Sequence, residues 1–329
     1  MNWGPPEKVL ITGGREMGGL AAFADGISAG FSELGLRSEI VRPSKLVSRL
    51  SELRNRRVLK LLSTTGVLGV PLANRAICIA HTLPLATEQG WCKLLVLVGS
   101  FKLCNVFPAA RVVAVSDYVA LHLHQLFKIQ IASTVGNPLA APFLESFDTN
   151  SYERSYITFV GRLVRCKRVN QLLPSICDLL DENPGLRCQI IGDGPERAAL
   201  EGSVDGHERI EFVGLQDCSY VREQLRRSKL FVSGAANEGF GIAYLEALSQ
   251  GCIVAMPATG GGIEIVLQRV GQNIQLLPIS LEPRKVLNVL RRALTLQPGP
   301  VCLAAYAPRE VASAYLSLDR TFFAHCHNS

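Results

Sequence analysis

Short apolar runs rich in β-branched residues alternate with stretches of helical length along the whole chain. In the first half, strands are expected at residues 8–12, 38–41, 76–80 and 111–115, and a glycine-rich turn and a helix over 21–34 follow the first of them. Strands separated by helical crossovers pair in parallel, and the helices cover both faces of the sheet. The first half therefore predicts an open parallel α/β sheet.

The second half repeats this alternation, with a break between the two halves. Five strands are expected there, at residues 156–160, 187–191, 209–213, 229–232 and 253–256. Residues 137–155, NPLAAPFLESFDTNSYERS, contain two prolines and several polar residues without a sustained period, as linkers do. We therefore expect two doubly wound, Rossmann-like α/β domains, residues 1–150 and 151–303, facing each other across a ligand-binding cleft.

Composition limits the class of protein further. With 48% hydrophobic and 19% charged residues, the chain is expected to form large cores, and its first residues lack the pattern of a signal peptide. We expect a cytoplasmic protein. The ten cysteines are scattered singly, mostly inside apolar runs, which favours reduced, buried side chains. Cys326 lies between His325 and His327, but no second ligand pair stands at zinc-like spacing, so no metal or cofactor is expected.

A basic segment lies in the first half. The net charge is +6, and residues 1–150 hold 15 Lys and Arg against 10 Asp and Glu. In residues 46–62, LVSRLSELRNRRVLKLL, leucines recur at helix-like intervals beside five cations, which are Arg49, Arg54, Arg56, Arg57 and Lys60. This pattern predicts an amphipathic helix with a basic face. Such a helix either attaches the protein peripherally to an anionic membrane surface or is an ordinary surface helix whose charges are solvated.

A glycine-rich turn and a helix start follow the fourth expected strand of the second half. There Glu238 precedes Gly239, Phe240 and Gly241. Small residues let a ligand approach the backbone, and the N–H groups of a helix N-terminus bind anions. Glu246 stands on the same helix among mainly apolar residues and requires a hydroxyl or cationic partner. Either glutamate alone is also compatible with a solvated side chain.

Glu238 and Glu246, eight positions apart around Gly-Phe-Gly, resemble the paired-glutamate motif of retaining glycosyltransferases of family four. Five further segments agree in the same order, at residues 159–167 (FVGRLVRCK), 190–196 (IIGDGPE), 213–215 (VGL), 260–264 (GGGIE) and 271–278. Together they extend over nearly all of residues 156–280. The resemblance implies the two-domain GT-B fold, with the nucleotide-sugar donor on the second domain and the acceptor on the first.

The resemblance also implies roles for single residues. Glu238 would accept hydrogen bonds from sugar hydroxyls and Glu246 from the ribose. Arg162 and Lys167 would neutralise the departing diphosphate, the arginine by bidentate contact and the lysine as a mobile point charge. Taken alone, either cation is equally a surface side chain. The other donor-binding candidates are Gly161, Gly192, Asp193, Gly239, Phe240 and Gly241, and an ordinary β–α turn explains Gly192 and Asp193 as well.

The first half resembles the family less closely. Its ITGGREMGGL lacks G-x-G-x-x-G spacing, but Gly18 and Gly19 resemble the loop that closes over the donor phosphates. His81 occupies the position of a histidine near the reacting sugar, or it is a packed or surface histidine. Ser116 and Asn137 resemble other landmarks of the family, for which a structural role is the alternative.

The chain departs from the family pattern at two places in these segments, and it ends in a helix. Pro138 and Arg168 stand where the family usually has glycine. The helix, expected over residues 306–323 within a segment 304–329, would cross back to the first domain.

The sequence thus predicts a retaining, metal-independent glycosyltransferase of the hexosyltransferase type. Its expected partners are a UDP-, GDP- or ADP-sugar donor and a lipid-linked or growing saccharide acceptor of cell-envelope or exopolysaccharide synthesis, with no nucleic acid. An anionic membrane surface is a candidate partner. The alternatives are another GT-B activity, such as a nucleotide-sugar hydrolase or phosphorylase, and a non-catalytic nucleotide-sugar binding protein.

Overall fold

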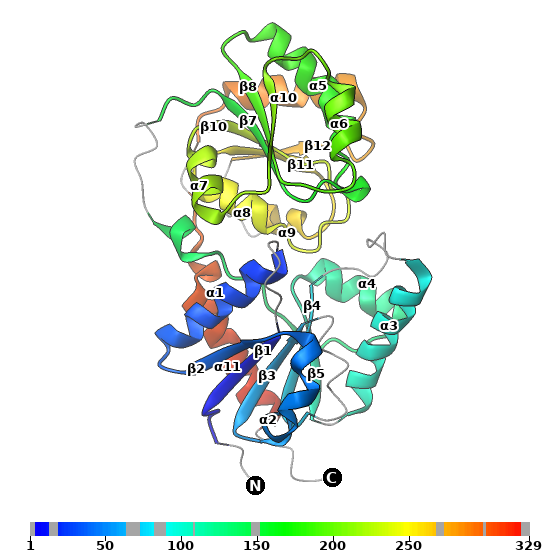
Figure 1. The fold of residues 1–329 in the computed structure, drawn as a ribbon, viewed down its shortest axis with the longest axis vertical. Helices are drawn as coiled ribbons and strands as arrows, with labels where there is room; N and C mark the ends of the chain where they lie inside the picture. The colour runs from blue at the N-terminus through cyan, green and yellow to red at the C-terminus, as the bar shows by residue number, and fades with distance from the viewer. Residues whose placement is uncertain are drawn as a thin grey trace. The chain divides into compact units, whose positions relative to one another are not determined.

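The chain divides into two compact units. The computed structural model describes residues 4–12, 19–63, 73–81, 90–107, 109–145, 152–267, 273–298 and 301–323. One unit comprises Met1–Ala141 with Ala304–Ser329, and the other comprises Pro142–Leu303 (Figure 1).

The first unit is built on a parallel sheet with the strand order β2-β1-β3-β4-β5-β6. Its strands are β1 (Lys8–Thr12), β2 (Arg37–Val41), β3 (Val58–Ser63), β4 (Ala76–Ala80), β5 (Ala110–Ala114) and β6 (Ser133–Thr134). Its helices are α1 (Gly19–Glu33), α2 (Leu50–Arg54), α3 (Gly90–Val106), α4 (Asp117–Phe127) and α11 (Pro308–Phe323). Helix α1 packs on β1 and β2 and against α11, whereas α3 and α4 pack on β5.

Helix α11 follows the whole second unit in sequence but belongs to the first unit. The backbones of α11 and α1 are in close contact. A Cβ on Gly30 of α1 would lie only 2.0 Å from the carbonyl oxygen of Pro308 at the start of α11. A glycine is therefore required on α1 where the two helices meet.

The prediction of a helix over residues 46–62 is wrong. The structure has a short 3₁₀ turn (Val47–Arg49), the five-residue α2, and then strand β3, whose six residues are all buried. Strand β3 pairs with β1 on one side and β4 on the other, so burial in the middle of the sheet decides its conformation. The leucines whose spacing indicated one helix are divided between two elements: some lie in α2 and the others lie in β3.

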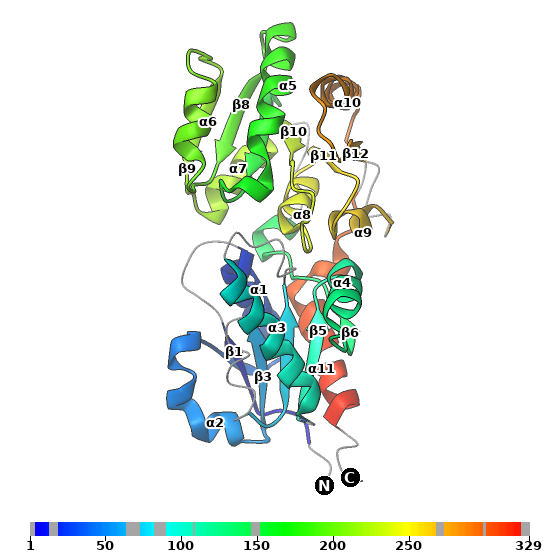
Figure 2. The ribbon, with the colours of Figure 1, turned by 90° about the vertical axis from the view of Figure 1, so that its right-hand side faces the viewer.

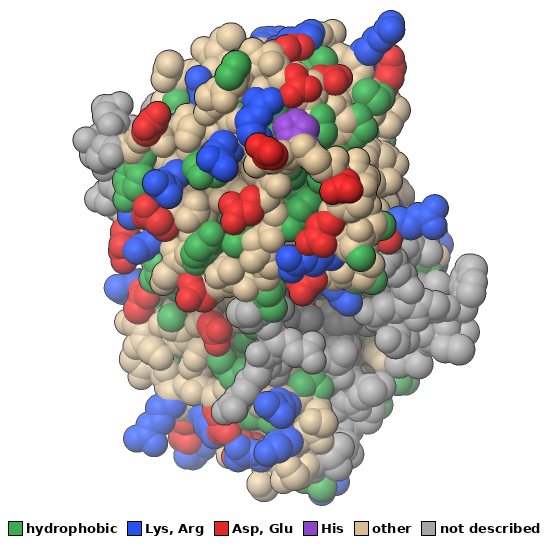
Figure 3. All heavy atoms as spheres, turned by 45° about the horizontal axis from the view of Figure 1, so that its top comes forward, with side chains coloured by type: hydrophobic (Ala, Val, Ile, Leu, Met, Phe, Trp, Pro, Cys, Tyr) green, Lys and Arg blue, Asp and Glu red, His purple; other side chains and the backbone are tan. Residues whose placement is uncertain are grey.

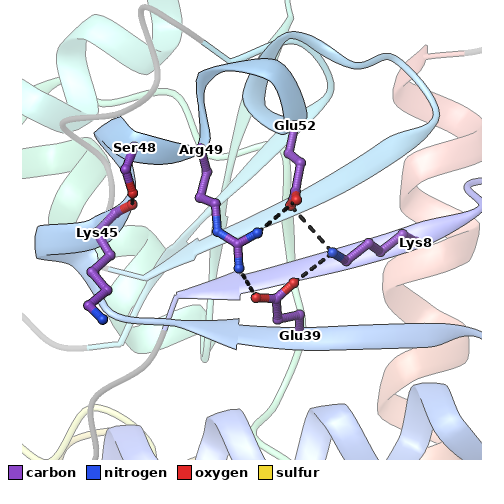
Figure 4. A network of polar contacts seen from close by, with 6 residues as sticks. All are labelled: Lys8, Glu39, Lys45, Ser48, Arg49 and Glu52. Carbon is purple, nitrogen blue, oxygen red and sulfur yellow. Dashed lines mark hydrogen bonds and ion pairs between the residues drawn. The ribbon is translucent and has the colours of Figure 1, made fainter.

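The cations of this segment are largely paired or buried. Nζ of Lys8 lies 2.6 Å from Oε2 of Glu39, and Arg49 pairs with both Glu39 and Glu52 (Figure 4). Arg57 pairs with a glutamate near the start of β1 at 2.7 Å. The segment is thus neither a continuous amphipathic helix nor an array of free cations, and it gives no support for attachment to a membrane.

Lys60 points from β3 into the interior of the first unit. Its Nζ donates hydrogen bonds to the carbonyl oxygens of Asn55 and Asn74, each at 2.5 Å. Burial, with the nearby Arg75 guanidinium, lowers the pKa of Lys60 to about 7.

A buried ion pair joins the first unit's sheet to α11. Arg75, just before β4, donates from Nε to Oδ1 of Asp319 at 2.7 Å, and Nη2 contacts the other carboxylate oxygen. Nη1 of the same arginine donates to the carbonyl oxygen of Arg56 at 2.9 Å. Arg75 is 2% exposed and Asp319 is fully buried, so each charge depends on the other for compensation.

The second unit has the strand order β12-β11-β10-β7-β8-β9, again all parallel. Its strands are β7 (Tyr156–Val160), β8 (Arg187–Ile191), β9 (Ile210–Gly214), β10 (Ser228–Val232), β11 (Ile253–Pro257) and β12 (Ile274–Leu277). Its helices are α5 (Val169–Glu182), α6 (Arg197–Ser203), α7 (Cys218–Arg226), α8 (Ile242–Ser249), α9 (Gly262–Leu267) and α10 (Pro283–Thr295). This is the doubly wound order predicted for each half of the chain.

Apolar residues of the strands and of α5 and α10 form the core of the second unit. At its surface, charges of opposite sign are interspersed (Figure 3), and ion pairs such as Arg209–Asp181 and Arg291–Glu182 contribute to this mixture. Within the described ranges, no helix combines the length and apolar character needed to cross a bilayer.

We predict that Asp319→Asn destabilises the first unit by about 3–5 kcal/mol, because it leaves the Arg75 charge buried without a counter-charge. Urea unfolding followed by far-ultraviolet circular dichroism measures this. Glu7→Gln is the matched control, because Glu7 pairs with Arg57 at the surface. Equal effects of the two substitutions would contradict the structural role of the buried pair.

Candidate functional site

The second unit contains a topological switch point between β7 and β10. These two strands are neighbours in the sheet, and the chain winds outward from them in opposite directions, through β8 and β9 on one side and β11 and β12 on the other (Figure 2). The loops after such a pair of strands diverge and leave a crevice where ligands bind. Lys167 lies beyond the end of β7, and Glu238 lies beyond the end of β10.

Lys167 and Glu238 form an ion pair across this switch point. Their side chains are 27% and 23% exposed, so both are held at the surface of the unit and not in its core. Desolvation lowers the pKa of Lys167, but the charge and hydrogen bond of Glu238 outweigh it, and the pKa ends above its ordinary value. The structure thus brings together two residues 71 positions apart that the sequence proposed for one site.

The loop that carries Glu238 rests on the loop after β11, backbone against backbone. The N–H of Gly261 donates to the carbonyl oxygen of Glu238 at 2.7 Å. A Cβ on Gly261 would lie 2.2 Å from the carbonyl oxygen of Gly239, and one on Gly260 would lie 2.8 Å from that of Glu238. The glycines of GGGIE therefore support Glu238 by allowing this close approach.

The loops after β7 and β8 touch in the same way. A Cβ on Gly192 would lie 1.9 Å from the carbonyl oxygen of Gly161, and one on Gly194 would lie 2.3 Å from that of Leu163. In addition, the N–H of Leu163 donates to the carbonyl oxygen of Asp193 at 2.9 Å. Gly192 has a φ of +138° and Gly194 of +159°, which side chains disfavour.

Asp193 and Arg162 lie on these two loops with different surroundings. The carboxylate of Asp193 accepts a hydrogen bond from the N–H of Gly194 at 2.7 Å and lies 4.0 Å from Nη1 of Arg197, as expected of a turn residue. Arg162 is exposed, and no residue in the described part of the chain is recorded as a partner of its guanidinium. The guanidinium of Arg162 is therefore available to an anion.

Helix α8 begins at the Gly-Phe-Gly turn without a side-chain cap. Gly241 occupies the N-cap position with a φ of +89°, and a Cβ there would lie 2.4 Å from the ring of Tyr244. Phe240 and Gly239 are buried beside it. Sequence reasoning missed Tyr244, whose hydroxyl lies 3.1 Å from Oγ of Ser233 under this turn.

Glu246 is half-buried on α8, and no hydrogen-bond partner of its carboxyl group is recorded among the described residues. Desolvation raises the pKa of Glu246 to about 8, so the group is mainly protonated at neutral pH. The hydroxyl or cationic partner that the sequence predicts for Glu246 stays a prediction.

Within the first unit, His81 directly follows β4 and packs edge-on against Phe23 with 4.6 Å between ring centroids. Its Nε2 is buried without a hydrogen-bond partner, and so is Oδ1 of Asn137. Desolvation lowers the pKa of His81 to about 4 while Asn137 opposes the shift, so the imidazole is neutral. Ser116 caps α4 by accepting from the N–H of Val119 at 3.1 Å, which is a structural role.

Two other predicted positions precede or begin α1. Gly19 is the first residue of the helix, and Gly18 lies outside the described residues, as do His325, Cys326 and His327. In the ranges that the structure describes, no group of three or more His, Cys, Asp or Glu is placed to hold a metal ion.

Residues 145–278 match the family model described as "Glycosyl transferases group 1". Over 116 residues the chain is 32% identical to a phosphatidylinositol N-acetylglucosaminyltransferase protein of Arabidopsis thaliana, covering 33% of this chain and 25% of that protein. The chain thus spans about a quarter of the length of the first curated relatives it matches.

Solved structures resemble the whole chain. The crystal structure of Anabaena HepE in complex with UDP and glucose superposes with a TM-score of 0.66 and 14% identity, covering 97% of this chain and 95% of that one. WaaG, a glycosyltransferase involved in lipopolysaccharide biosynthesis, gives a TM-score of 0.66 and 13% identity, covering 97% and 96%. At these identities the likeness shows the fold, which is GT-B, as the sequence predicted.

We predict that Glu246→Gln changes how stability depends on pH. Between its ordinary pKa of 4.5 and the folded value of about 8, the folded chain binds a proton that the unfolded chain releases, so wild-type stability falls as pH rises through this window. The glutamine variant lacks that fall, and denaturant unfolding at several pH values measures it. Glu208→Gln, at an exposed position of the same unit, should keep the wild-type fall. A fall of wild-type size in the Glu246 variant would contradict the assigned burial.

Proposed function

Because the chain belongs to the glycosyl transferases group 1 family and has its fold, we propose that it transfers a sugar from a nucleotide-sugar donor to an acceptor with retention of anomeric configuration. The observation that carries the proposal is the pairing of Lys167 with Glu238 at the switch point of the second unit, where family-matching segments converge.

The charges at this site suit a departing nucleoside diphosphate. In a glycosyl transfer the bond from the anomeric carbon to the diphosphate breaks, and negative charge grows on the leaving oxygen. Lys167 stabilises that charge as an ammonium that its surroundings keep protonated, and the exposed Arg162 binds the diphosphate with its two-pronged guanidinium. Both cations are at the carboxyl end of the same strand.

The two glutamates bind the sugar and the nucleoside. In the absence of donor, the carboxylate of Glu238 is occupied by Lys167. When the diphosphate draws the ammonium toward itself, Glu238 becomes available to sugar hydroxyls, so the pair exchanges one set of partners for another without leaving a charge uncompensated. Glu246, which lies on α8, accepts hydrogen bonds from the ribose hydroxyls.

Within the first unit, we propose that His81 contacts a sugar hydroxyl, and the roles that the resemblance implies for Gly18 and Gly19 stay predictions. A neutral imidazole both donates and accepts hydrogen bonds, which suits contact with a sugar hydroxyl. The orphaned Nε2 of His81 supports this role, because a buried polar atom without a partner is costly unless a ligand satisfies it.

We propose a UDP-sugar as donor and a lipid-linked saccharide or lipid as acceptor. The first part rests on HepE, whose crystal structure contains UDP and glucose. The second rests on the phosphatidylinositol N-acetylglucosaminyltransferase protein of Arabidopsis thaliana and on WaaG, which is involved in lipopolysaccharide biosynthesis.

Lys167→Ala should lower turnover about 10²- to 10³-fold, the range for loss of one preorganised donor to a developing negative charge. Lys285→Ala is the control, because Lys285 is a surface cation of the same unit, paired with Glu282 on α10. Steady-state rates of sugar transfer measure both variants. Turnover near the wild-type rate in the Lys167 variant would refute the assigned role.

A panel of UDP-, GDP- and ADP-sugars should identify the donor by thermal shift, with UDP-sugars giving the largest increase in Tm. A ligand present at a hundredfold excess over its Kd stabilises the folded chain by about 2.7 kcal/mol. Addition of EDTA should leave both the shift and the transfer rate unchanged, because cationic side chains offset the diphosphate charge. A transfer rate abolished by EDTA would contradict the metal-independent site.

A further inference from the structure

Arg168 directly follows Lys167 in the loop after β7. It adopts the left-handed conformation, with φ of +50° and ψ of +35°, between the 3₁₀ turn Arg165–Lys167 and α5. A residue with a side chain is disfavoured in this conformation relative to the right-handed one, and glycine avoids that penalty. The side chain of Arg168 makes contacts that stabilise the loop in this conformation.

Those contacts join three loops at the carboxyl edge of the sheet. Nε of Arg168 donates to the carbonyl oxygen of Gly234, after β10, at 2.5 Å, and Nη1 donates to that of Ile279, after β12, at 2.7 Å. A Cβ on Gly234 would lie 2.9 Å from the carbonyl oxygen of Lys167, so the two backbones already touch at this point. One side chain thus connects the Lys167 loop to the loop that leads to Glu238.

We propose that Arg168 is a positioning residue that holds Lys167 in register with Glu238 by fastening the loop after β7 to the loops after β10 and β12. This inference rests on the proposed function for its kinetic consequence, but the positioning itself is a property of the unliganded chain. Because a displacement of about 1 Å in a catalytic group can cost about a hundredfold in rate, hydrogen bonds that fix the Lys167 loop affect turnover.

Two variants separate the side chain from the backbone. Arg168→Met keeps a long side chain and the unfavourable left-handed conformation but removes the hydrogen-bond donors. Arg168→Gly removes the donors and also relieves the unfavourable conformation. Each should lower kcat about tenfold or more while changing the KM for donor less than about threefold, because Lys167 acts mainly on the leaving group. In a Lys167→Ala background neither should lower kcat further, since the residue being positioned is gone. Undiminished kcat in Arg168→Met, or a full additional loss in the Lys167→Ala background, would overturn the proposal.

A second readout does not require sugar transfer. The pH profile for acylation of the Lys167 amine, read by peptide mass spectrometry, should move to lower pH in both Arg168 variants, because a loosened amine loses part of the Glu238 contact that keeps it protonated. The matched control is Arg154→Met, which removes a guanidinium that donates to the carbonyl oxygens of Ser228, Gln250 and Gly251 at the opposite edge of the same sheet. That control should leave the Lys167 profile unchanged.

The two readouts distinguish failure of the positioning from failure of the function. A wild-type chain that transfers no sugar refutes the proposed function, while a shifted Lys167 profile in the Arg168 variants still supports the positioning. An unshifted profile refutes the positioning whether or not the chain is an active transferase.

Discussion

The loops of the second unit meet backbone to backbone at the carboxyl edge of its sheet, and these contacts support the loops that carry Arg162, Lys167 and Glu238. Gly192 and Gly194 rest on the loop after β7, and Gly261 rests on the loop before α8. No side chain fits between these segments, so each loop has few ways to move without its neighbour. Charged side chains attached to such a framework are preorganised, and a preorganised charge stabilises a transition state without the cost of reorienting during the reaction.

Two ion pairs of the chain differ in environment and therefore in what they do. The pair between Arg75 and Asp319 is buried on all sides, and its loss would leave a charge inside a core. The pair between Lys167 and Glu238 is about a quarter exposed, which screens its attraction and reduces its contribution to stability. A partly exposed pair can exchange its partners for those of a ligand, whereas a buried pair cannot without unfolding its surroundings. The first pair therefore maintains the fold, and the second is suited to binding.

Much of the architecture was predictable because it depends on local patterns. The bounds expected for β1, β4, β7 and β8 are those observed, since each is a short apolar run between clear turn residues. Strand β3 was not predictable, because its leucines fit a helical period and only its neighbours in the sheet identify it as a strand. The proximity of Lys167 and Glu238 followed from a family resemblance and not from spacing. The contacts of Arg75 with Asp319, 244 positions apart, and of Arg168 with two distant carbonyl groups have no signal in a single sequence.

The placement of α11 has a consequence for the order in which the chain becomes structured during synthesis. Residues 142–303 form a unit from one continuous stretch, so all of its strands are synthesised before α11 is translated. The first unit, although it begins earlier, waits for α11 to cover α1 and to supply the carboxylate that Arg75 needs. Until then a guanidinium and an apolar helix face are open to solvent or to a chaperone. The unit nearer the N-terminus is therefore the last to be completed.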